Sequence, residues 1–211
     1  MGELKVNIVR HPLISDKLAK LRNKSTNHQF FRTLVKQISI FLFYSAAAGL
    51  PVKKVEIESP LAKSMEEIVE GDIVIVPIFR AGIVMAEGIL EVCEEARVGH
   101  IGIYRDESSL KPVKYYYKVP KSLPNSKITV IVDPMLATGG TAVKTVEFLK
   151  NDGAGKVTLI SIIASPEGVR KVNEACPDVD IFVASVDEKL NEKGYILPGL
   201  GDAGDRLYGT K

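Results

Sequence analysis

The stretch IVDPMLATGGTAVK, residues 131–144, carries the strongest local signal in the chain. Aliphatic residues lead into Asp133, and the sequence Thr-Gly-Gly-Thr at 138–141 then stands where a helix begins. The free N–H groups of a first helical turn point outward, and the helix dipole there favours negative charge. The glycines let the backbone approach an anion closely, and the threonines add hydroxyl donors. The stretch therefore predicts a strand, a phosphate-binding loop and a helix.

Two features of this loop limit the classes of ligand that it can bind. No lysine follows the glycines, so it is not the loop of a nucleoside triphosphatase. Asp133 ends its strand at the edge where open α/β sheets bind ligands, and its carboxylate is placed to accept hydrogen bonds from two ribose hydroxyls. The alternative is a simple turn and helix cap, but the aliphatic strand before the acid favours a sugar-phosphate site.

The rest of the chain alternates between apolar runs and helical patterns. Alternation of this kind predicts βαβ units, and hence an α/β fold with a mostly parallel twisted sheet flanked by helices. We expect a single domain over 1–211, a long amphipathic helix at 26–48, and a strand with one solvated face at 52–59. The strands expected in the sheet are 73–79, 98–104, 127–133, 156–164 and 180–186, with helices at 83–93, 139–154 and 166–175.

A lysine- and tyrosine-rich segment interrupts this alternation. Between 113 and 119, apolar and aromatic residues alternate with Lys114, Tyr116 and Lys118, which predicts an exposed β-hairpin arm at about 105–125. Three roles remain open: a solvated or subunit-packing arm, a mobile lid over a phosphate-rich site, and an RNA contact.

The composition excludes several classes of protein. The 28 basic and 26 acidic residues give a net charge of +2, too small for a global nucleic-acid or membrane footprint. Cys93 and Cys176 form no Cys-x-x-Cys motif and are expected to be inert, mostly buried thiols. The three histidines lack metal-ligand spacing. Charges near the N-terminus and the absence of a span-length apolar window predict a cytoplasmic protein.

The motif GLGDAG at 199–204 fits the dinucleotide pattern Gly-x-Gly-x-x-Gly. That pattern has meaning only after a strand and at the start of a helix inside a βαβ unit. Only seven residues, Asp205 to Lys211, follow it, which is too few for a crossover helix and a second strand. A dinucleotide-dependent oxidoreductase is therefore excluded by context.

The segment VDPMLATGGTA, residues 132–142, resembles the ribosyl-phosphate loop of the type I phosphoribosyltransferases. Most of that superfamily has two adjacent acids here, whereas Asp133-Pro134 is similar to the uracil phosphoribosyltransferase branch. The likeness continues through VRHPLI, PIFRAGI, IYRDE and GYILPGLGDAGDRLYGTK, and so covers nearly the whole chain. It implies a small base-binding hood, formed by the N-terminal and C-terminal segments, over the sheet.

The resemblance implies transfer of a phosphoribosyl group from 5-phosphoribosyl 1-diphosphate (PRPP) to uracil, giving UMP. Arg80 and Arg105 match the family's diphosphate-binding arginines, although both could be ordinary surface residues. The implied PRPP-binding residues are Arg80, Arg105, Asp133, Pro134, Met135, Leu136, Ala137, Thr138, Gly139, Gly140, Thr141 and Asp202. The implied uracil-binding residues are Ile196, Gly201, Asp202 and Ala203.

The implied catalytic residues are Asp202, Arg105 and Asp133. For Asp202 three roles are open: orienting the base or ribose, deprotonating the base nitrogen, or holding the glycine-rich turn. Orientation is favoured because uracil is acidic enough to need no strong base. Mg²⁺ is the implied cofactor, bound mainly by substrate oxygens and water rather than by a protein cage.

The family also suggests partners. It is oligomeric, so we expect a homodimer or homotetramer, and a GTP activator is left open because some members have one. A regulatory protein that binds messenger RNA on the same scaffold is the main rival. It requires a concentrated basic face, and this chain offers only the arm at 111–121, so no nucleic-acid or membrane partner is expected.

Overall fold

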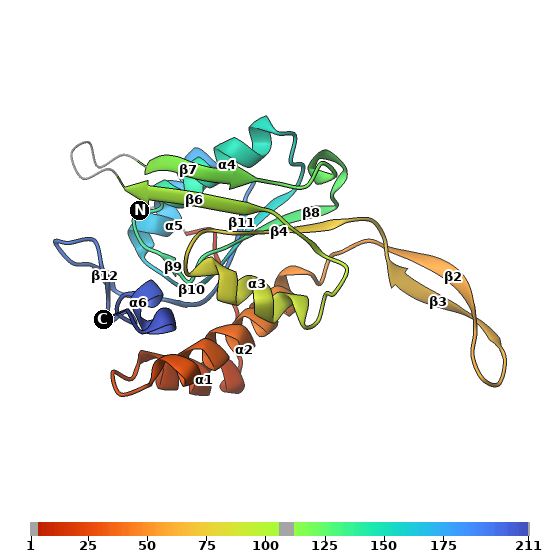
Figure 1. Cartoon of the computed structure of the whole chain (residues 1–211), viewed down its shortest axis with the longest axis horizontal. Helices are drawn as coiled ribbons and strands as arrows, with labels where there is room; N and C mark the ends of the chain where they lie inside the picture. The colour runs from red at the N-terminus through yellow and green to blue at the C-terminus, as the bar shows by residue number, and fades with distance from the viewer. Residues whose placement is uncertain (1–3, 106–111, 211) are drawn as a thin grey trace.

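The computed structural model describes residues 4–105 and 112–210, and a parallel sheet forms its centre (Figure 1). Among these residues the sheet has seven strands in the order β1-β11-β10-β8-β4-β5, with β9 paired to β10. All of its pairings are parallel, which confirms the predicted fold class. The strands are β1 (Asn7–Ile8), β4 (Ile73–Pro77), β5 (Arg97–Val98), β8 (Ile128–Val132), β9 (Met135–Leu136), β10 (Val157–Ala164) and β11 (Asp180–Val186).

Helices cover both faces of this sheet, which explains the continuous apolar runs of β4, β8 and β10. One hydrophobic core joins the sheet to α1 (Pro12–Arg22), α2 (His28–Ala46), α3 (Gly82–Leu90) and α6 (Ala203–Tyr208). A second core on the other face contains α4 (Gly140–Asn151) and α5 (Pro166–Ala175). None of the helices in the described part of the chain is long and apolar enough to cross a membrane.

The segment expected as one strand at 98–104 divides into two. Its first residue, Val98, lies in β5, and β6 (His100–Arg105) then pairs antiparallel with β7 (Pro112–Lys118). The predicted arm at 105–125 thus begins at the end of β6 and includes β7 and a 3-10 helix, η1 (Leu123–Asn125), while its residues 106–111 lie outside the described part of the chain. The side chains from Val113 to Tyr116 are exposed, whereas Tyr117 packs against Phe148 of α4 with the ring centroids 5.9 Å apart.

A second hairpin projects much further from the body of the molecule (Figure 1). It consists of β2 (Val52–Glu58) and β3 (Lys63–Val69), which pair only with each other among the described strands. The prediction of one buried face at 52–59 was wrong, because all of β2 is exposed except Val55, which is half-buried. Alternation in the sequence predicted a strand correctly, but it did not predict that both faces of this strand are largely exposed.

The start of α5 packs directly against the loop that follows β8. Ser165 caps α5 by accepting a hydrogen bond from Gly168 N at 2.9 Å, and its hydroxyl donates to Ala137 O at 2.6 Å. A Cβ atom on Gly168 would lie 2.3 Å from that same carbonyl oxygen. The start of α5 therefore packs so closely against the backbone of the loop that only glycine fits at position 168.

Replacing Gly168 by alanine is expected to destabilise the protein by about 1–3 kcal/mol, because the methyl group overlaps the backbone of Ala137. In a chain of this size, this corresponds to a loss of about 2–4 °C in melting temperature for each kcal/mol. Circular dichroism melts would measure the change. Gly155→Ala is the matched control, since no atom lies within 4 Å of its added Cβ. Equal melting temperatures for the two variants would contradict the proposed contact.

Candidate active site

The predicted phosphate loop forms a pocket at the carboxyl end of β8. Gly139 takes the N-cap position of α4 with φ +76°, a left-handed conformation that favours glycine. Pro134 and Gly140 belong to the same loop but do not line the pocket. The lining residues are Asp133, Met135, Leu136, Ala137, Thr138, Gly139, Thr141, Ala142, Leu159 and Ser161.

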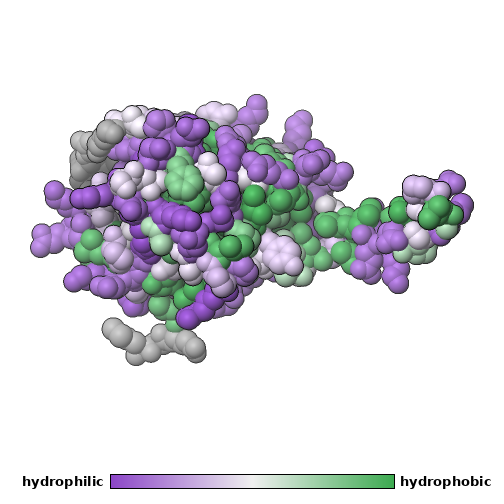
Figure 2. All heavy atoms as spheres, turned by 90° about the horizontal axis from the view of Figure 1, so that it is seen from below, coloured by the Kyte–Doolittle hydropathy of each residue, from purple (hydrophilic) through white to green (hydrophobic). Residues whose placement is uncertain are grey.

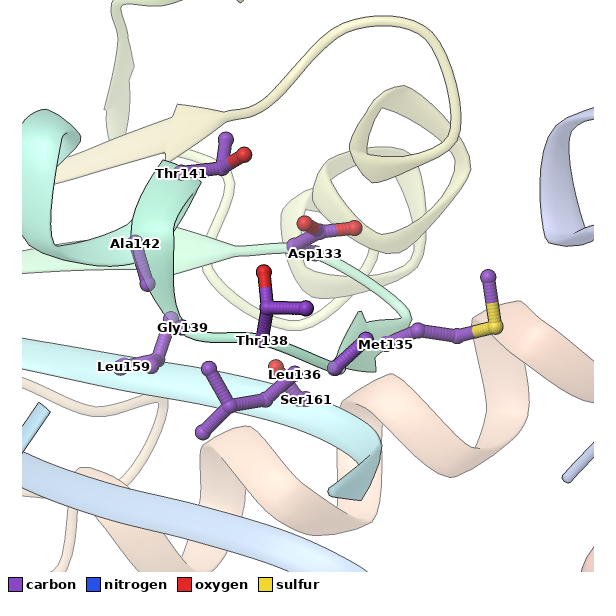
Figure 3. Close-up of a pocket in the computed structure, with 10 residues that line it drawn as sticks. Asp133, Met135, Leu136, Thr138, Gly139, Thr141, Ala142, Leu159 and Ser161 are labelled. Carbon is purple, nitrogen blue, oxygen red and sulfur yellow. The ribbon is translucent and has the colours of Figure 1, made fainter. Parts of the chain in front are cut away.

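Three polar side chains converge on this pocket (Figure 3). The carboxylate of Asp133 and the hydroxyls of Thr138 and Thr141 are directed into the same space. Lys171 of α5 adds a cation nearby, because its Nζ lies 3.6 Å from where a Cβ on Gly140 would stand. Hydroxyl donors, a helix N-terminus and a lysine together suit a phosphate group. Sequence reasoning missed Lys171, since nothing local signals its approach to the loop.

Asp133 is the acid at the centre of the pocket. Burial raises its pKa to about 7, and only the hydrogen bond from the backbone N–H of Met135 acts in the opposite direction. A carboxyl with so few donors gains much from ligand hydroxyls, which stabilise its ionised form. Its position and its pKa both fit a group that accepts hydrogen bonds from a sugar.

Arg80 lies in the turn after β4, beside the C-terminal segment. Its Nη2 atom is 3.6 Å from Oδ1 of Asp205. A Cβ on Gly204 would be 3.2 Å from the same Nη2 and 3.3 Å from Oδ1 of Asp202. The structure therefore brings Arg80 and Asp202 to the same place. Arg105 is the last residue of β6, and its side chain lies outside the described part of the chain.

The predicted base segment folds into a short strand, a turn and a helix. Ile196 lies in β13 (Ile196–Leu197), which pairs with β12 (Lys189–Leu190), and both Ile196 and Ala203 are buried. Gly201 is exposed with φ +77°. Asp202 caps α6, a helix that sequence reasoning missed, by accepting a hydrogen bond from Asp205 N at 3.0 Å. Of its three predicted roles, holding the turn is therefore present in the structure.

This base segment abuts the phosphate loop. A Cβ on Gly194, in the turn between β12 and β13, would lie 3.8 Å from Cγ2 of Thr138. The predicted residues of the loop, of the turn after β4 and of the C-terminal segment thus meet at one edge of the sheet. Among the described residues, no group of three or more His, Cys, Asp or Glu side chains is arranged to hold a metal ion.

An ion pair that sequence reasoning missed anchors the base segment. Nη2 and Nη1 of Arg22 donate to the two carboxylate oxygens of Asp187 at 2.5 and 2.6 Å. Nη1 also donates to Gly199 O at 2.6 Å, and Gly199 N donates back to Asp187 at 3.0 Å. Helix α1 and the start of the glycine-rich turn are therefore held together.

Comparison with known proteins agrees with this geometry. Residues 8–210 match the family model described as uracil phosphoribosyltransferase. Uracil phosphoribosyltransferases of Dictyoglomus turgidum and of Clostridium botulinum strain Eklund 17B are 50% and 51% identical to the chain over 98% of its length, and the matches cover 100% and 99% of those proteins.

Solved structures give the same result. A protein from Aquifex aeolicus superposes with a TM-score of 0.92 at 39% identity, over 98% of this chain and 99% of that one. Adenine phosphoribosyltransferase from Leishmania donovani shares the fold at a TM-score of 0.59 and 15% identity, over 91% and 88% of the two chains. The chain therefore belongs to the uracil phosphoribosyltransferase family.

Proposed function

We propose that the protein transfers the 5-phosphoribosyl group of PRPP to N1 of uracil, giving UMP and diphosphate. The pocket between β8 and α4 carries the proposal, because a carboxylate and two hydroxyls face it beside a helix N-terminus. Relatives that are about half identical over almost the whole chain are named uracil phosphoribosyltransferase. The sugar phosphate that we assign to the pocket is the part that PRPP and the product UMP share.

Each part of the site has a separate task in this reaction. The N–H groups of the loop, with Thr138 and Thr141, bind the 5′-phosphate, and Asp133 accepts hydrogen bonds from the ribose hydroxyls. Arg80 and Arg105 neutralise the departing diphosphate. Positioning and electrostatics supply most of the catalysis, because the base nitrogen and the anomeric carbon must be held in line.

The C-terminal segment contacts the base. Together with α1 it forms the hood, which consists of α1 and residues 187–208. The buried side chains of Ile196 and Ala203 anchor this segment in the hydrophobic core, and Gly201 exposes backbone groups that suit the alternating donors and acceptors of a pyrimidine. Asp202 orients the substrates in this proposal, since its carboxylate is already held in place by the N–H of Asp205.

Magnesium fits the site as an ion that arrives with the substrate. A bound Mg²⁺ would lower the negative charge of the leaving diphosphate. In this proposal the ion is held mainly by diphosphate oxygens and water rather than by protein side chains. Asp133 is the acidic residue that lines the pocket itself and would face such a complex.

The reaction is tested by mixing the protein with Mg²⁺, PRPP and one base at a time: uracil, orotate, hypoxanthine or adenine. UMP from uracil alone is the expected product, and Asp202→Asn and Arg105→Ala should each reduce its rate by at least about tenfold. Chromatographic detection of the nucleotide, with and without GTP, measures the rate and any activation. Product from another base would overturn the assignment of the base segment, and no product in any mixture would favour the RNA-binding rival.

The pKa of Asp133 predicts a pH dependence for both stability and activity. Its folded-state pKa of about 7 lies above the usual value, so its contribution to stability is fully present below about pH 4 and is lost as the pH rises through 7. Asp133→Asn should therefore melt higher than the wild type at pH 8. It should also bind PRPP more weakly, because the neutral amide is a poorer acceptor for two ribose hydroxyls.

Profiles of kcat/KM for PRPP between pH 5.5 and 8.5 would check the same group. We expect kcat/KM of the wild type to rise with pH, with an apparent pKa near 7. This is the pKa of Asp133 in the free enzyme, which kcat/KM reports. The step should be absent in Asp133→Asn, which leaves only the titration of PRPP itself. Identical profiles for the two proteins would assign the step to the substrate and contradict this role.

Self-association through the hairpin β2–β3 is the second part of the proposal. The hairpin exposes apolar side chains that a single chain leaves uncovered, and Figure 2 shows them along the hairpin and at its root. At that root, α2, β2, β3 and the residues after α3 line an apolar groove of about 520 Å³. The exposed apolar residues of the hairpin and of its root are Tyr44, Val52, Ile57, Leu61, Met65, Ile68, Val69 and Val92. A second copy of the chain is the occupant that fits, because a surface of this kind marks an interface.

Charged substitutions on the hairpin should therefore separate the subunits. Leu61 is 96% exposed and Met65 60%, so Leu61→Asp with Met65→Asp is not expected to unfold the monomer. Light scattering after size-exclusion chromatography should show a dimer or tetramer for the wild type and a smaller species for this variant. Val113→Asp, on the other hairpin, is the control. A monomeric wild type, or a variant of unchanged mass, would contradict the interface.

A further inference from the structure

Two hydroxyls inside the central strand β10 have no hydrogen-bond partner among the described residues. They belong to Thr158 and Ser161, whose exposed fractions are 1% and 0%. A buried hydroxyl without a partner costs about 1–3 kcal/mol, and such groups are rare in folded proteins. Apolar residues fill the remainder of this strand, so the two hydroxyls require an explanation.

The two hydroxyls face opposite sides of the sheet. Side chains alternate along a strand, so Ser161 shares a face with Leu159, and both line the phosphate pocket. Thr158 points to the other side and does not line this pocket. Figure 3 shows Ser161 below the loop, next to Leu136 and Thr138. The buried hydroxyl that lacks a partner on this face is therefore part of the pocket floor.

The chemistry of the pocket identifies what this hydroxyl would meet. The other polar groups are the acceptor Asp133, the hydroxyls of Thr138 and Thr141, and the N–H groups of the loop. A phosphate group offers several acceptor oxygens, and a serine hydroxyl donates well to a negatively charged oxygen. Ser161 also lies on a strand paired on both edges, with β8 and β11, so its position is set before any ligand binds.

We propose that Ser161 is a further phosphate-binding residue, whose hydroxyl donates from the floor of the pocket to an oxygen of the sugar phosphate. This inference rests on the proposed function, which places the 5′-phosphate in the loop. It assigns to β10 a substrate contact in addition to those of the loop. It also gives the unpaired hydroxyl of Ser161 a partner, because the ligand accepts its hydrogen bond.

Ser161→Ala and Thr158→Val form a matched pair, since each removes one buried, unpaired hydroxyl from the same strand. Isothermal titration with ribose 5-phosphate should show about tenfold weaker binding for Ser161→Ala and unchanged binding for Thr158→Val. KM for PRPP should rise to a similar extent in Ser161→Ala, while KM for uracil stays close to the wild-type value. Without ligand, Ser161→Ala should melt at or above the wild-type temperature, because it removes an unsatisfied group.

Each other outcome has a distinct meaning. Wild-type affinity in Ser161→Ala, or an equal loss in Thr158→Val, would overturn the role of Ser161. A lower melting temperature of ligand-free Ser161→Ala with unchanged binding would also overturn the role of Ser161. It would mean that the hydroxyl is bonded to an internal water instead of to the ligand. If the wild type itself binds no ribose 5-phosphate and forms no UMP, the proposed function fails instead, so the two failures are distinguishable.

Discussion

A buried ion pair holds together the part of the molecule in which the candidate site lies. Asp187 follows the last strand of the sheet and exposes only 2% of its side chain. Burial would raise its pKa, but hydrogen bonds from Arg22, Ser185 and Gly199 N, with the charge of Arg22, hold it below the usual value. Removing one partner of such a pair leaves a buried charge and costs about 3–5 kcal/mol. The first helix, the sheet and the C-terminal turn therefore depend on one another.

The parallel sheet separates the two surfaces to which we assign functions. Strands β4, β8 and β10 end at the same edge, so the turn after β4, the phosphate loop and the cap of α5 meet there. The hairpin β2–β3 leads into β4 at its other end and projects away from that edge (Figure 1). An interface on the hairpin thus leaves the substrate pocket open.

The parts of the fold and of the site that could be predicted are those that depend on residues close together in the sequence. The strands at 128–132 and 157–164 and the loop after Asp133 are encoded by local patterns, so their prediction was close. The pairing of Arg22 with Asp187 joins residues 165 positions apart, and no local pattern reports it. The same holds for Lys171, which approaches the glycines of the loop, and for Ser161, which lines the pocket, because only packing brings them there. The burial of β2 was predicted wrongly, because alternation in the sequence predicts a strand but does not show whether another element covers one of its faces.

The contrast between two acids explains where the site lies. Asp187 is surrounded by donors from Arg22, Ser185 and Gly199, so its charge is satisfied within the folded chain. Asp133 receives one backbone N–H that opposes the effect of burial on its pKa, and the hydroxyl of Ser161 has no partner among the described residues. Buried polar groups are normally paired, so the buried hydroxyl of Ser161 and the half-buried carboxylate of Asp133 leave hydrogen-bonding capacity unused in the free protein. The unmet hydrogen bonds are complementary to a sugar phosphate, with an acceptor for its hydroxyls and a donor for its phosphate oxygens. In the proposed function, this unused hydrogen-bonding capacity contributes to the affinity for the substrate.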